Sequence, residues 1–325
     1  MLVMAGLLGL LAVGGLALAT DLSEDAIDDS PDDAPPDATS DEVEQIDFAS
    51  LTQDLILPGS DLDDLIQSGT GNDQINGYDG DDMIDGGDGK DDLHGGTGDD
   101  RLSGNAGDDT LHGQDGDDLM DGGSGDDLMF GHNDNDTLQG GDDDDELHGG
   151  DGSDVLLGQD GHDSLHGGQG DDLIVGGRGQ DTLFGGSGND TISGLEPDAP
   201  GSEISDRDYL NGGDGDDTIL AGEGDVVTSG PGQDTIVLGD WIQGEDCAQI
   251  MDFDNEQDQL LMVCDLTENP DPEVEIVEDA ETPGLSHILI DGTEIARVVG
   301  GTTLTSDDII LIDHSDGAAF GLTAV

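Results

Sequence analysis

One residue type recurs at a spacing that could support chemistry: an aspartate stands in the same slot of every nine residues. From Ser68 to Ser193 the chain reads as fourteen consecutive nonapeptides, and their sixth position is always Asp, beginning with Asp73 and Asp82. Each carboxylate offers a hard oxygen atom. The spacing therefore provides a regular series of oxygen donors, and its strict period predicts a repeat architecture that stacks these donors along the molecule.

The other positions of the nonapeptide indicate the elements that hold these carboxylates. The eighth position is Ile, Leu or Met throughout, the first is Gly except at Ser68, and the fourth is Gly except at Asp134 and Asp143. Because Gly reaches backbone angles that other residues avoid, we expect the first six residues to form a tight turn. The last three should form a minimal strand whose aliphatic residue faces inward. Stacked units would then pair their strands in parallel and bury one aliphatic column.

These residues match the pattern Gly-Gly-x-Gly-x-Asp-x-aliphatic-x, so about 170 of the 325 residues resemble an RTX calcium-binding β-roll. The resemblance implies an all-β, right-handed parallel β-roll with two nonapeptides per turn. It also implies several Ca²⁺ ions between the loops of successive coils, held by the sixth-position carboxylates and by backbone carbonyls of the Gly-rich loops. Ca²⁺ takes about six to eight oxygen ligands, in agreement with such a donor set. The expected calcium ligands are Asp64, Asp73, Asp82, Asp91, Asp100, Asp109, Asp118, Asp127, Asp136, Asp145, Asp154, Asp163, Asp172, Asp181, Asp190, Asp208, Asp217, Asp225 and Asp234.

Composition favours folding that depends on ions. The chain has 81 acidic and 5 basic residues, a formal charge of −76, and 2% aromatic residues. Without counter-ions a compact chain of this charge repels itself, and two inward aliphatics per coil cannot offset the entropy of ordering eighteen residues. We therefore expect folding and calcium binding to be one event. The alternative, an acidic and Gly-rich disordered tract, requires neither the fixed phase nor the aliphatic eighth position.

The N-terminal region contains three segments that differ in composition. Residues 1–19 are only Met, Leu, Val, Ala and Gly, and they end in Ala17-Leu18-Ala19, which resembles a signal-peptide cleavage site. No positively charged residue precedes the apolar run, and its length also suits a membrane anchor, so both readings stay open and both predict an extracellular or cell-surface location. Residues 20–47 predict an acidic disordered linker, and residues 48–67 an N-terminal cap with a degenerate repeat.

The consensus lapses after the fourteenth repeat and then returns. Residues 194–202, with Pro197 and Pro200, predict a loop, and residues 203–238 a second RTX block. Residues 239–325 predict a β-rich C-terminal cap that covers the open strands of the last coil. Within it, Asp291-Gly292 between two β-branched runs, 286–290 and 293–299, predicts a hairpin.

Three features outside the calcium pattern could also carry function. The histidines of four ninth positions are separated by multiples of eighteen, so in a two-repeat coil they fall in line with Phe130 and Phe184. They could share a Zn²⁺ or Cu²⁺ ion, or they could be a row of solvent-exposed polar side chains without a ligand; these residues are His94, His112, His148 and His166.

The opposite face should carry an exposed apolar patch that binds a partner or lies beneath the 194–202 loop; its residues are Val155, Leu157, Leu173 and Val175. The two cysteines could form a disulfide or remain two buried thiols; they are Cys247 and Cys264.

Several function classes are excluded. The chain has no Gly-x-Ser-x-Gly elbow, Walker loop or zinc-protease motif, and the histidines at 162 and 166 flank a sixth-position Asp and an eighth-position Leu, so we expect no enzyme. The charge excludes nucleic acid and anionic membranes as partners, apart from contact through residues 1–19. The third and fifth positions do not carry regular rows of Thr and Asn, which excludes ice binding.

We predict a calcium-binding structural protein, exported or surface-anchored; the alternative is a calcium-dependent adhesion or interaction module that uses the C-terminal cap or the exposed patch. The sequence leaves the partner, the export route, the number of ions and the oligomeric state open.

Overall fold

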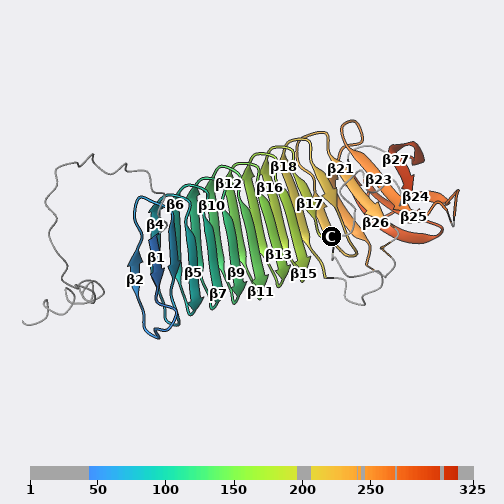
Figure 1. Ribbon diagram of the computed structural model, residues 1–325. Helices are drawn as coiled ribbons and strands as arrows, with labels where there is room; N and C mark the ends of the chain where they lie inside the picture. The colour runs from blue at the N-terminus through green and yellow to red at the C-terminus, as the bar shows by residue number, and fades with distance from the viewer. Residues whose placement is uncertain are drawn as a thin grey trace, which may run out of the picture. The chain divides into compact units, whose positions relative to one another are not determined.

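The computed structural model describes residues 44–195, 206–239, 241–242, 246–267, 269–300 and 304–313. Within these residues the protein is all-β apart from one short 3-10 helix, η1 (Ser306–Asp308). The strands form two sheets, and neighbouring strands along the roll are two apart in the sequence order. The chain therefore crosses to the other sheet after each strand and winds as a parallel β-solenoid (Figure 1), which confirms the predicted β-roll.

Sheet A contains thirteen strands and sheet B fourteen. In order across the sheet, the strands of sheet A are β1 (Glu44–Asp47), β3 (Asp64–Gln67), β5 (Met83–Asp88), β7 (Arg101–Ala106), β9 (Leu119–Ser124), β11 (Thr137–Asp142), β13 (Val155–Asp160), β15 (Leu173–Arg178), β17 (Thr191–Ser193), β19 (Thr218–Leu220), β21 (Thr235–Gly239), β23 (Gln259–Cys264) and β27 (Ile309–Asp313). Those of sheet B are β2 (Ile56–Pro58), β4 (Gln74–Asp79), β6 (Asp92–Thr97), β8 (Thr110–Asp115), β10 (Leu128–Asn133), β12 (Glu146–Asp151), β14 (Ser164–Gln169), β16 (Thr182–Ser187), β18 (Tyr209–Asp214), β20 (Val226–Thr228), β22 (Ala248–Phe253), β26 (Thr293–Gly300), β25 (Leu285–Ile290) and β24 (Val274–Glu278).

Each complete strand of the roll is longer than the three residues expected. β12 begins at the seventh position of one repeat and continues through the third position of the next, which leaves only the fourth to sixth positions for the turn. The expectation of a six-residue turn was wrong because the Gly-rich residues also pair with the adjacent coil: Gly150 lies opposite Gly168, and Asp151 opposite Gln169. Gly150 has φ of 124°, and a side chain there would contact the carbonyl of His132 in the preceding coil.

The hydrophobic core is two columns of eighth-position side chains that face each other between the sheets. Leu147 pairs in register with Leu165 in sheet B, and Leu156 pairs with Ile174 in sheet A. All four side chains are fully buried. The aliphatic column predicted from the eighth position is therefore present, and each coil contributes one side chain to it from each sheet.

At the N-terminal end, ordered structure begins earlier than expected. Residues 44–47, the last four of the segment predicted as a linker, instead form β1, in which Ile46 pairs with Ile66. Ile46 is apolar and packs against the core, so it extends sheet A by one strand. Residues 1–19, which carry the signal-or-anchor prediction, lie outside the described residues, as do most of the linker and of the 194–202 loop. In the part that the structure describes, no helix is both long and apolar enough to cross a membrane.

After β17 the sequence separation between neighbouring coils changes. Most ladder hydrogen bonds of the roll join residues 18 apart, but Asp181 and Asp208 are 27 apart. The chain between β17 and β18 is therefore nine residues longer than the regular connection. Beyond this connection β18 continues sheet B in register, with Leu210 opposite Leu183.

The C-terminal strands extend both sheets and then close sheet B with antiparallel strands. β22 and β26 pair in parallel, whereas β25 pairs with β26 and β24 in the antiparallel sense. Asp291 and Gly292 both have positive φ, 51° and 81°, at the turn between β25 and β26, so the predicted hairpin is confirmed. Cys247 and Cys264 are two buried thiols, and no disulfide joins them.

Candidate metal centre: two aspartate ladders

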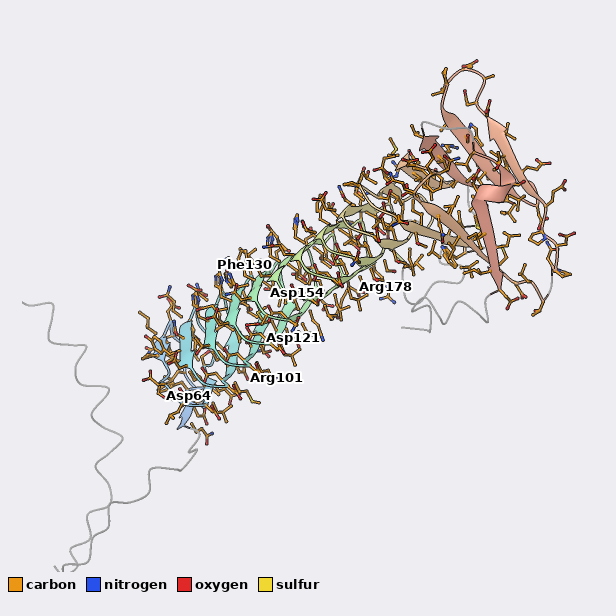
Figure 2. All side chains as sticks on the ribbon, turned by 90° about the horizontal axis from the view of Figure 1, so that it is seen from above. Asp64, Arg101, Asp121, Phe130, Asp154 and Arg178 are labelled. Carbon is orange, nitrogen blue, oxygen red and sulfur yellow. The ribbon has the colours of Figure 1, made fainter. Side chains whose placement is uncertain are left out.

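The sixth-position aspartates lie inside the roll, at the point where each turn enters a strand. None of the nineteen expected ligands has more than 3% of its surface exposed. Asp154, for example, ends the turn before β13 and is 1% exposed; Figure 2 labels it together with Asp64, nearer the N-terminus. Burying so many carboxylates is costly unless each finds partners, so the contacts of these side chains decide what the roll can do.

From Asp73 onward, one oxygen of each sixth-position carboxylate accepts a backbone N–H of the preceding coil, whereas both oxygens of Asp64 contact Ser60. Oδ1 of Asp154 accepts the N–H of Asp136 at 2.8 Å, and the N–H of Asp154 itself donates to Oδ1 of Asp172 at 2.8 Å. The same bond recurs along sheet A. A second series runs along sheet B, where the N–H of Asp73 donates to Asp91. The result is two continuous ladders in which backbone hydrogen bonds fix the orientation of each carboxylate.

The second oxygen has no hydrogen-bond partner along most of both ladders, although it is fully buried. A buried acceptor without a partner costs roughly 1–3 kcal/mol, and more when it is charged. Such a repeated exception calls for an explanation by an ion or a proton. The Oδ2 atoms concerned belong to Asp73, Asp82, Asp91, Asp100, Asp109, Asp118, Asp127, Asp136, Asp145, Asp154, Asp163, Asp172, Asp190, Asp217 and Asp234.

These oxygens converge with backbone carbonyls from the next coil. A methyl group placed on Gly149 would contact Oδ2 of Asp154 and would lie 2.6 Å from the carbonyl oxygen of Gly167. Only Gly leaves this space open, which explains the first-position glycine. Carboxylate and carbonyl oxygens at adjustable separations are the ligands that Ca²⁺ prefers. The donor set therefore fits calcium, with oxygens from two successive coils facing one place.

Burial also makes these groups resist ionisation. The pKa of Asp145 is raised to about 8, chiefly because burial penalises the charged form; the hydrogen bond from the Asp127 backbone partly opposes this, and the nearby charge of Asp163 adds to it. The pKa of Asp136 is also raised to about 8, again mainly by burial. In a fold without metal these carboxylates would thus retain protons near neutral pH, whereas a divalent cation would favour their charged form.

Three other expected ligands, Asp64, Asp208 and Asp225, have different surroundings. Oδ2 of Asp64 accepts the N–H of Ser60 at 2.7 Å, and Oδ2 of Asp225 accepts the N–H of Gly222 at 2.6 Å. Oδ2 of Asp208 faces the same place beside Gly194 as Oδ2 of Asp225. At Asp64 a backbone N–H already occupies the second oxygen, whereas the carboxylates of Asp208 and Asp225 converge beside Gly194, and their combined charge favours a cation there.

The repeat pattern missed one member of the sheet A ladder. Asp258 lies just before β23, is 9% exposed, and its Oδ1 accepts the N–H of Asp234 at 3.3 Å. It follows Asp234 by 24 residues instead of the usual spacing, so a nine-residue period could not locate it. In sheet B the ladder ends earlier, because Ala248 stands one residue before the Gln249 that pairs with Val226.

A further exposed ladder runs through the fifth positions. The N–H of Asp99 donates to Oδ1 of Asp81 at 3.1 Å, and the N–H of Asp117 donates to Oδ1 of Asp99 at 3.1 Å. Its bonds point in the opposite direction along the chain from those of the buried ladders. The frequency of Asp and Asn at the fifth position was the available signal, and it reflects this side-chain bond to the next turn.

The ninth-position rings form one stack on sheet B. His94 and His112 stack with ring centres 4.6 Å apart, and His148 and His166 with centres 4.9 Å apart. Phe130 lies between the two pairs, 5.0 Å from both His112 and His148. Burial lowers the pKa of His112 and of His166. Ligand atoms of Asp92, His94 and His112 all lie within 4.8 Å of one another.

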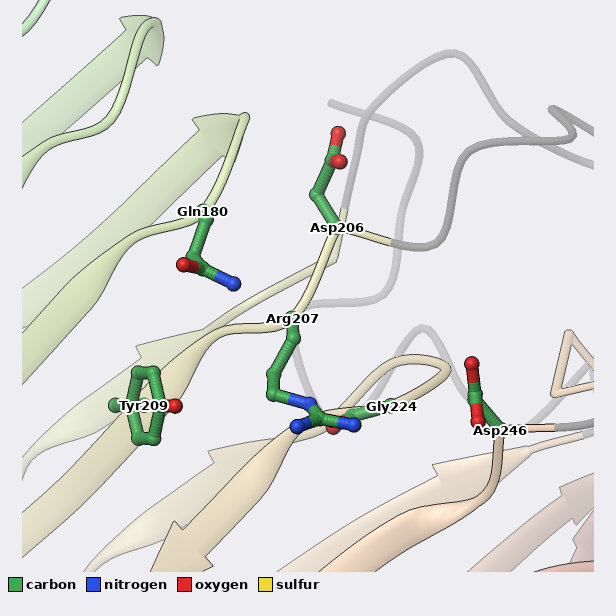
Figure 3. Close-up of a pocket in the computed structure, with 6 residues that line it drawn as sticks. All are labelled: Gln180, Asp206, Arg207, Tyr209, Gly224 and Asp246. Atoms are coloured by element: carbon green, nitrogen blue, oxygen red, sulfur yellow. The ribbon is translucent and has the colours of Figure 1, made fainter.

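A separate cavity of about 210 Å³ lies beside the turn at Gly224 (Figure 3). Asp206, Asp246 and Arg207 all line it, and the Arg207 Nε donates to the Gly224 carbonyl at 3.1 Å. Because a guanidinium repels cations, this cavity is a poor site for calcium. The ladder interior remains the better candidate.

Comparison with known proteins was consistent with the repeat geometry. The model of the RTX calcium-binding nonapeptide repeat (4 copies) matches residues 58–93, 94–129, 130–165, 166–196 and 205–227. Among solved structures, the chain is similar to the extracellular lipase LipA from Serratia marcescens, with 17% identity, a TM-score of 0.22, and coverage of 69% of this chain and 40% of that chain. The chain thus spans less than half of that lipase, and a similarity at this level carries no argument about function. No curated protein matches the chain.

Proposed function

Because the chain belongs to the family of RTX calcium-binding nonapeptide repeats, we propose that it is a non-enzymatic structural protein whose roll becomes rigid when Ca²⁺ binds along the two buried ladders. The observation that carries the proposal is the row of buried Oδ2 atoms without a hydrogen-bond partner. The proposed ligands are the sixth-position aspartates together with first-position carbonyls, as at Asp154 and Gly167.

Each residue of the repeat has a defined part in holding calcium. The Asp Oδ1 hydrogen bond to the preceding coil orients the carboxylate, and its Oδ2 then faces the carbonyl of the following coil. The absence of a side chain at Gly149 keeps that space open. Calcium supplies positive charge between oxygens that otherwise repel each other, and it joins consecutive coils directly.

Coupling between binding and folding follows from the charge and the small core. Every coil adds a buried carboxylate from each sheet but only one aliphatic side chain from each. Since the chain carries a formal charge of −76, self-repulsion opposes a compact form without counter-ions. The free energy of calcium binding then becomes free energy of folding.

Far-UV circular dichroism of the full chain tests this coupling. We expect a β-rich spectrum in millimolar Ca²⁺ and a largely disordered one after addition of EDTA, with recovery when excess Ca²⁺ is restored. Mg²⁺ at the same concentration is the control, because it demands a smaller octahedral site and dehydrates reluctantly. A spectrum that EDTA leaves unchanged would refute calcium-coupled folding.

We further propose that the protein works outside the cell or at its surface. The apolar composition of residues 1–19 supports export or anchoring, and secreted proteins meet far more calcium than cytosolic ones. Fractionation of cells and medium, with N-terminal sequencing of the mature chain, separates a cleaved signal from a retained anchor. Recovery of the full-length chain in the cytosol would contradict both.

A calcium-dependent adhesion module is the second candidate. β24 is the last strand of sheet B, and within the part of the chain that the structure describes no strand pairs with its outer edge, as strand addition by a partner would require. Leu173, 41% exposed, lies opposite Val155 on the neighbouring strand and belongs to the predicted apolar patch. Pull-down with the chain in Ca²⁺ and in EDTA distinguishes the two functions: a purely structural roll retains no specific partner, whereas an adhesion module retains one only in Ca²⁺.

A further inference from the structure

Two histidines and one aspartate gather on the outer face of sheet B, away from the buried ladders. We propose that Asp92, His94 and His112 form a second metal site, selective for Zn²⁺ or a similar transition metal over Ca²⁺. Their ligand atoms lie within 4.8 Å of one another, and Nε2 of His94 lies 3.0 Å from Oδ1 of Asp92.

The parallel register of the roll builds this site. His94 on β6 lies directly opposite His112 on β8, and the ring planes differ by 6°. Asp92 belongs to the same strand as His94, two residues earlier, so both side chains lie on one face of the sheet. Zn²⁺ bonds to nitrogen or oxygen are about 2.0–2.2 Å long, so binding requires the half-buried, stacked rings to rotate about their side-chain torsions until the three donors point to one place.

Ring contacts on the other edge support metal binding through Nε2. The Nε2 of Gln114 lies 3.3 Å from Nδ1 of His94, and the Nε2 of His132 lies 3.1 Å from Nδ1 of His112. A metal-bound imidazole usually donates its other N–H to a neighbouring acceptor. A turn of the Gln114 amide presents its oxygen to that N–H, and a neutral His132 accepts from His112 in the same way. Gln114 and His132 are therefore positioning residues.

The donor types decide which ion binds. Two imidazoles and one carboxylate suit Zn²⁺, Cu²⁺ or Co²⁺, with water as a further ligand, whereas Ca²⁺ prefers oxygen throughout. The site opens into a surface hollow that Asp54, Asp91 and Lys90 also line. Carboxylates outnumber the single ammonium there, so the local field favours cations.

The second histidine pair provides a matched control within the same chain. His148 and His166 stack as His94 and His112 do, and Nε2 of His148 lies 2.9 Å from Oε1 of Glu146. Ser164 takes the place next to His166, with its Oγ 3.3 Å from the ring Nε2. Among the described residues, the three-donor geometry is found at Asp92, His94 and His112 but not at this pair.

Calorimetric titration of the full chain with Zn²⁺, in saturating Ca²⁺, tests the proposal. We expect one Zn²⁺ equivalent whose affinity falls at least about tenfold in His94→Ala, His112→Ala and Asp92→Asn, but stays unchanged in His166→Ala. Co²⁺ supplies a second readout, since its visible absorption is strong in a four-coordinate protein site and weak in the aqueous ion, and it should fall in His112→Ala. Gln114→Ala should weaken binding without changing the Co²⁺ spectrum, as expected for a positioning residue.

Two results would overturn the site. One is Zn²⁺ binding that His112→Ala leaves unchanged; the other is an equal loss in His112→Ala and His166→Ala, which would indicate diffuse binding along the ring stack. Circular dichroism in Ca²⁺ checks that each variant folds. Because every titration is done on the calcium-loaded roll, a failure of this site leaves the calcium proposal intact, and a failure of calcium-coupled folding is seen before any Zn²⁺ is added.

Discussion

Replacement of Asp154 by Asn separates the role of its charge from the role of its hydrogen bond. In the Asp154→Asn variant the amide oxygen can still accept the N–H of Asp136, which is now 2.8 Å from Oδ1. The amide nitrogen then replaces Oδ2, the buried oxygen without a partner. The variant thus preserves the ladder and its side-chain volume but removes one negative charge from the proposed calcium site.

The expected magnitude follows from that one lost contact. A contact between a polar group and a charged one contributes about 1.5–3 kcal/mol, which corresponds to roughly 10- to 150-fold in Ca²⁺ affinity. The cost falls on the coils before and after β13, because Asp154 also donates its N–H to Asp172. Asp154→Ala also removes the acceptor of the Asp136 N–H, and this should lower the free energy of unfolding by about 1–3 kcal/mol more.

Asp121→Asn is the matched control. Asp121 is exposed on β9, and Figure 2 labels it on the same roll as Asp154. Both substitutions remove one of the 81 acidic residues, so the general effect of net charge is the same in both. An exposed change of this kind alters stability by no more than about 0.5 kcal/mol, or roughly twofold in affinity.

The assay is a Ca²⁺ titration followed by circular dichroism and by calorimetry, with the two variants and the unchanged protein at one ionic strength. We expect the midpoint of Asp154→Asn to rise well above that of Asp121→Asn. Equal midpoints would show that calcium responds to net charge alone and that the buried ladder does not ligate it. That result would refute the reasoning even if the roll still folded.

Three further predictions test other parts of the structure. Gly149→Ala places a methyl group against Asp154 Oδ2 and the Gly167 carbonyl, so its Ca²⁺ midpoint should rise; a normal titration would disprove the close approach. The folded-state pKa of Asp145, about 8 without metal, exceeds its unfolded value, so its contribution to the calcium-free fold is complete below about pH 4 and is lost as the pH rises through 8; circular dichroism in EDTA should show more β structure at acidic pH, and identical spectra would contradict this. Hydrogen bonds to Glu294 and Asp279 raise the pKa of His287, so His287→Gln should lower the melting temperature in Ca²⁺ more at pH 5.5 than at pH 8; an equal loss at both would show that its charge does not matter.

The architecture was predictable because one period constrains two kinds of atom at once. Each repeat has an Asp and, two positions later, an aliphatic residue. Because the repeats follow one another without a gap, stacking them buries the aliphatic side chains in one column and aligns the carboxylates in another. The strand length was not predictable in the same way. Gly150 has no strand propensity, and it becomes part of β12 only because Gly168 of the next coil offers a partner.

The buried aspartates proposed as calcium ligands follow from the repeat as a set but not as individuals. Asp64 and Asp225 occupy correct slots, yet the Ser60 and Gly222 backbones already donate to their second oxygens. Those bonds depend on how the local turn folds, which the repeat does not encode. Asp258 is the reverse case: its place in the ladder is set by the three-dimensional stack of β23 on β21, while its distance along the chain follows no period.

The histidine column shows a similar limit. Its spacing predicted the alignment of His94 with His112, but it did not distinguish this pair from His148 and His166. The difference lies in the seventh position of the same strands, where Asp92 places a short carboxylate beside the ring and Glu146 a longer and more exposed one. The ninth position alone does not show which carboxylate lies beside each ring.

The buried ladders have a consequence for how order spreads along the roll. Each carboxylate accepts from the turn one coil nearer the N-terminus, so a turn is held by the coil that follows it. In sheet A the last such acceptor is Asp258, placed by strands that belong to the packed C-terminal part of the core. The same hydrogen bond orients the carboxylate of the following coil and holds the turn of the preceding one, so it couples neighbouring coils in both directions. Since repeats of a solenoid contact chiefly their neighbours, an ordered coil favours order in the coils on either side of it.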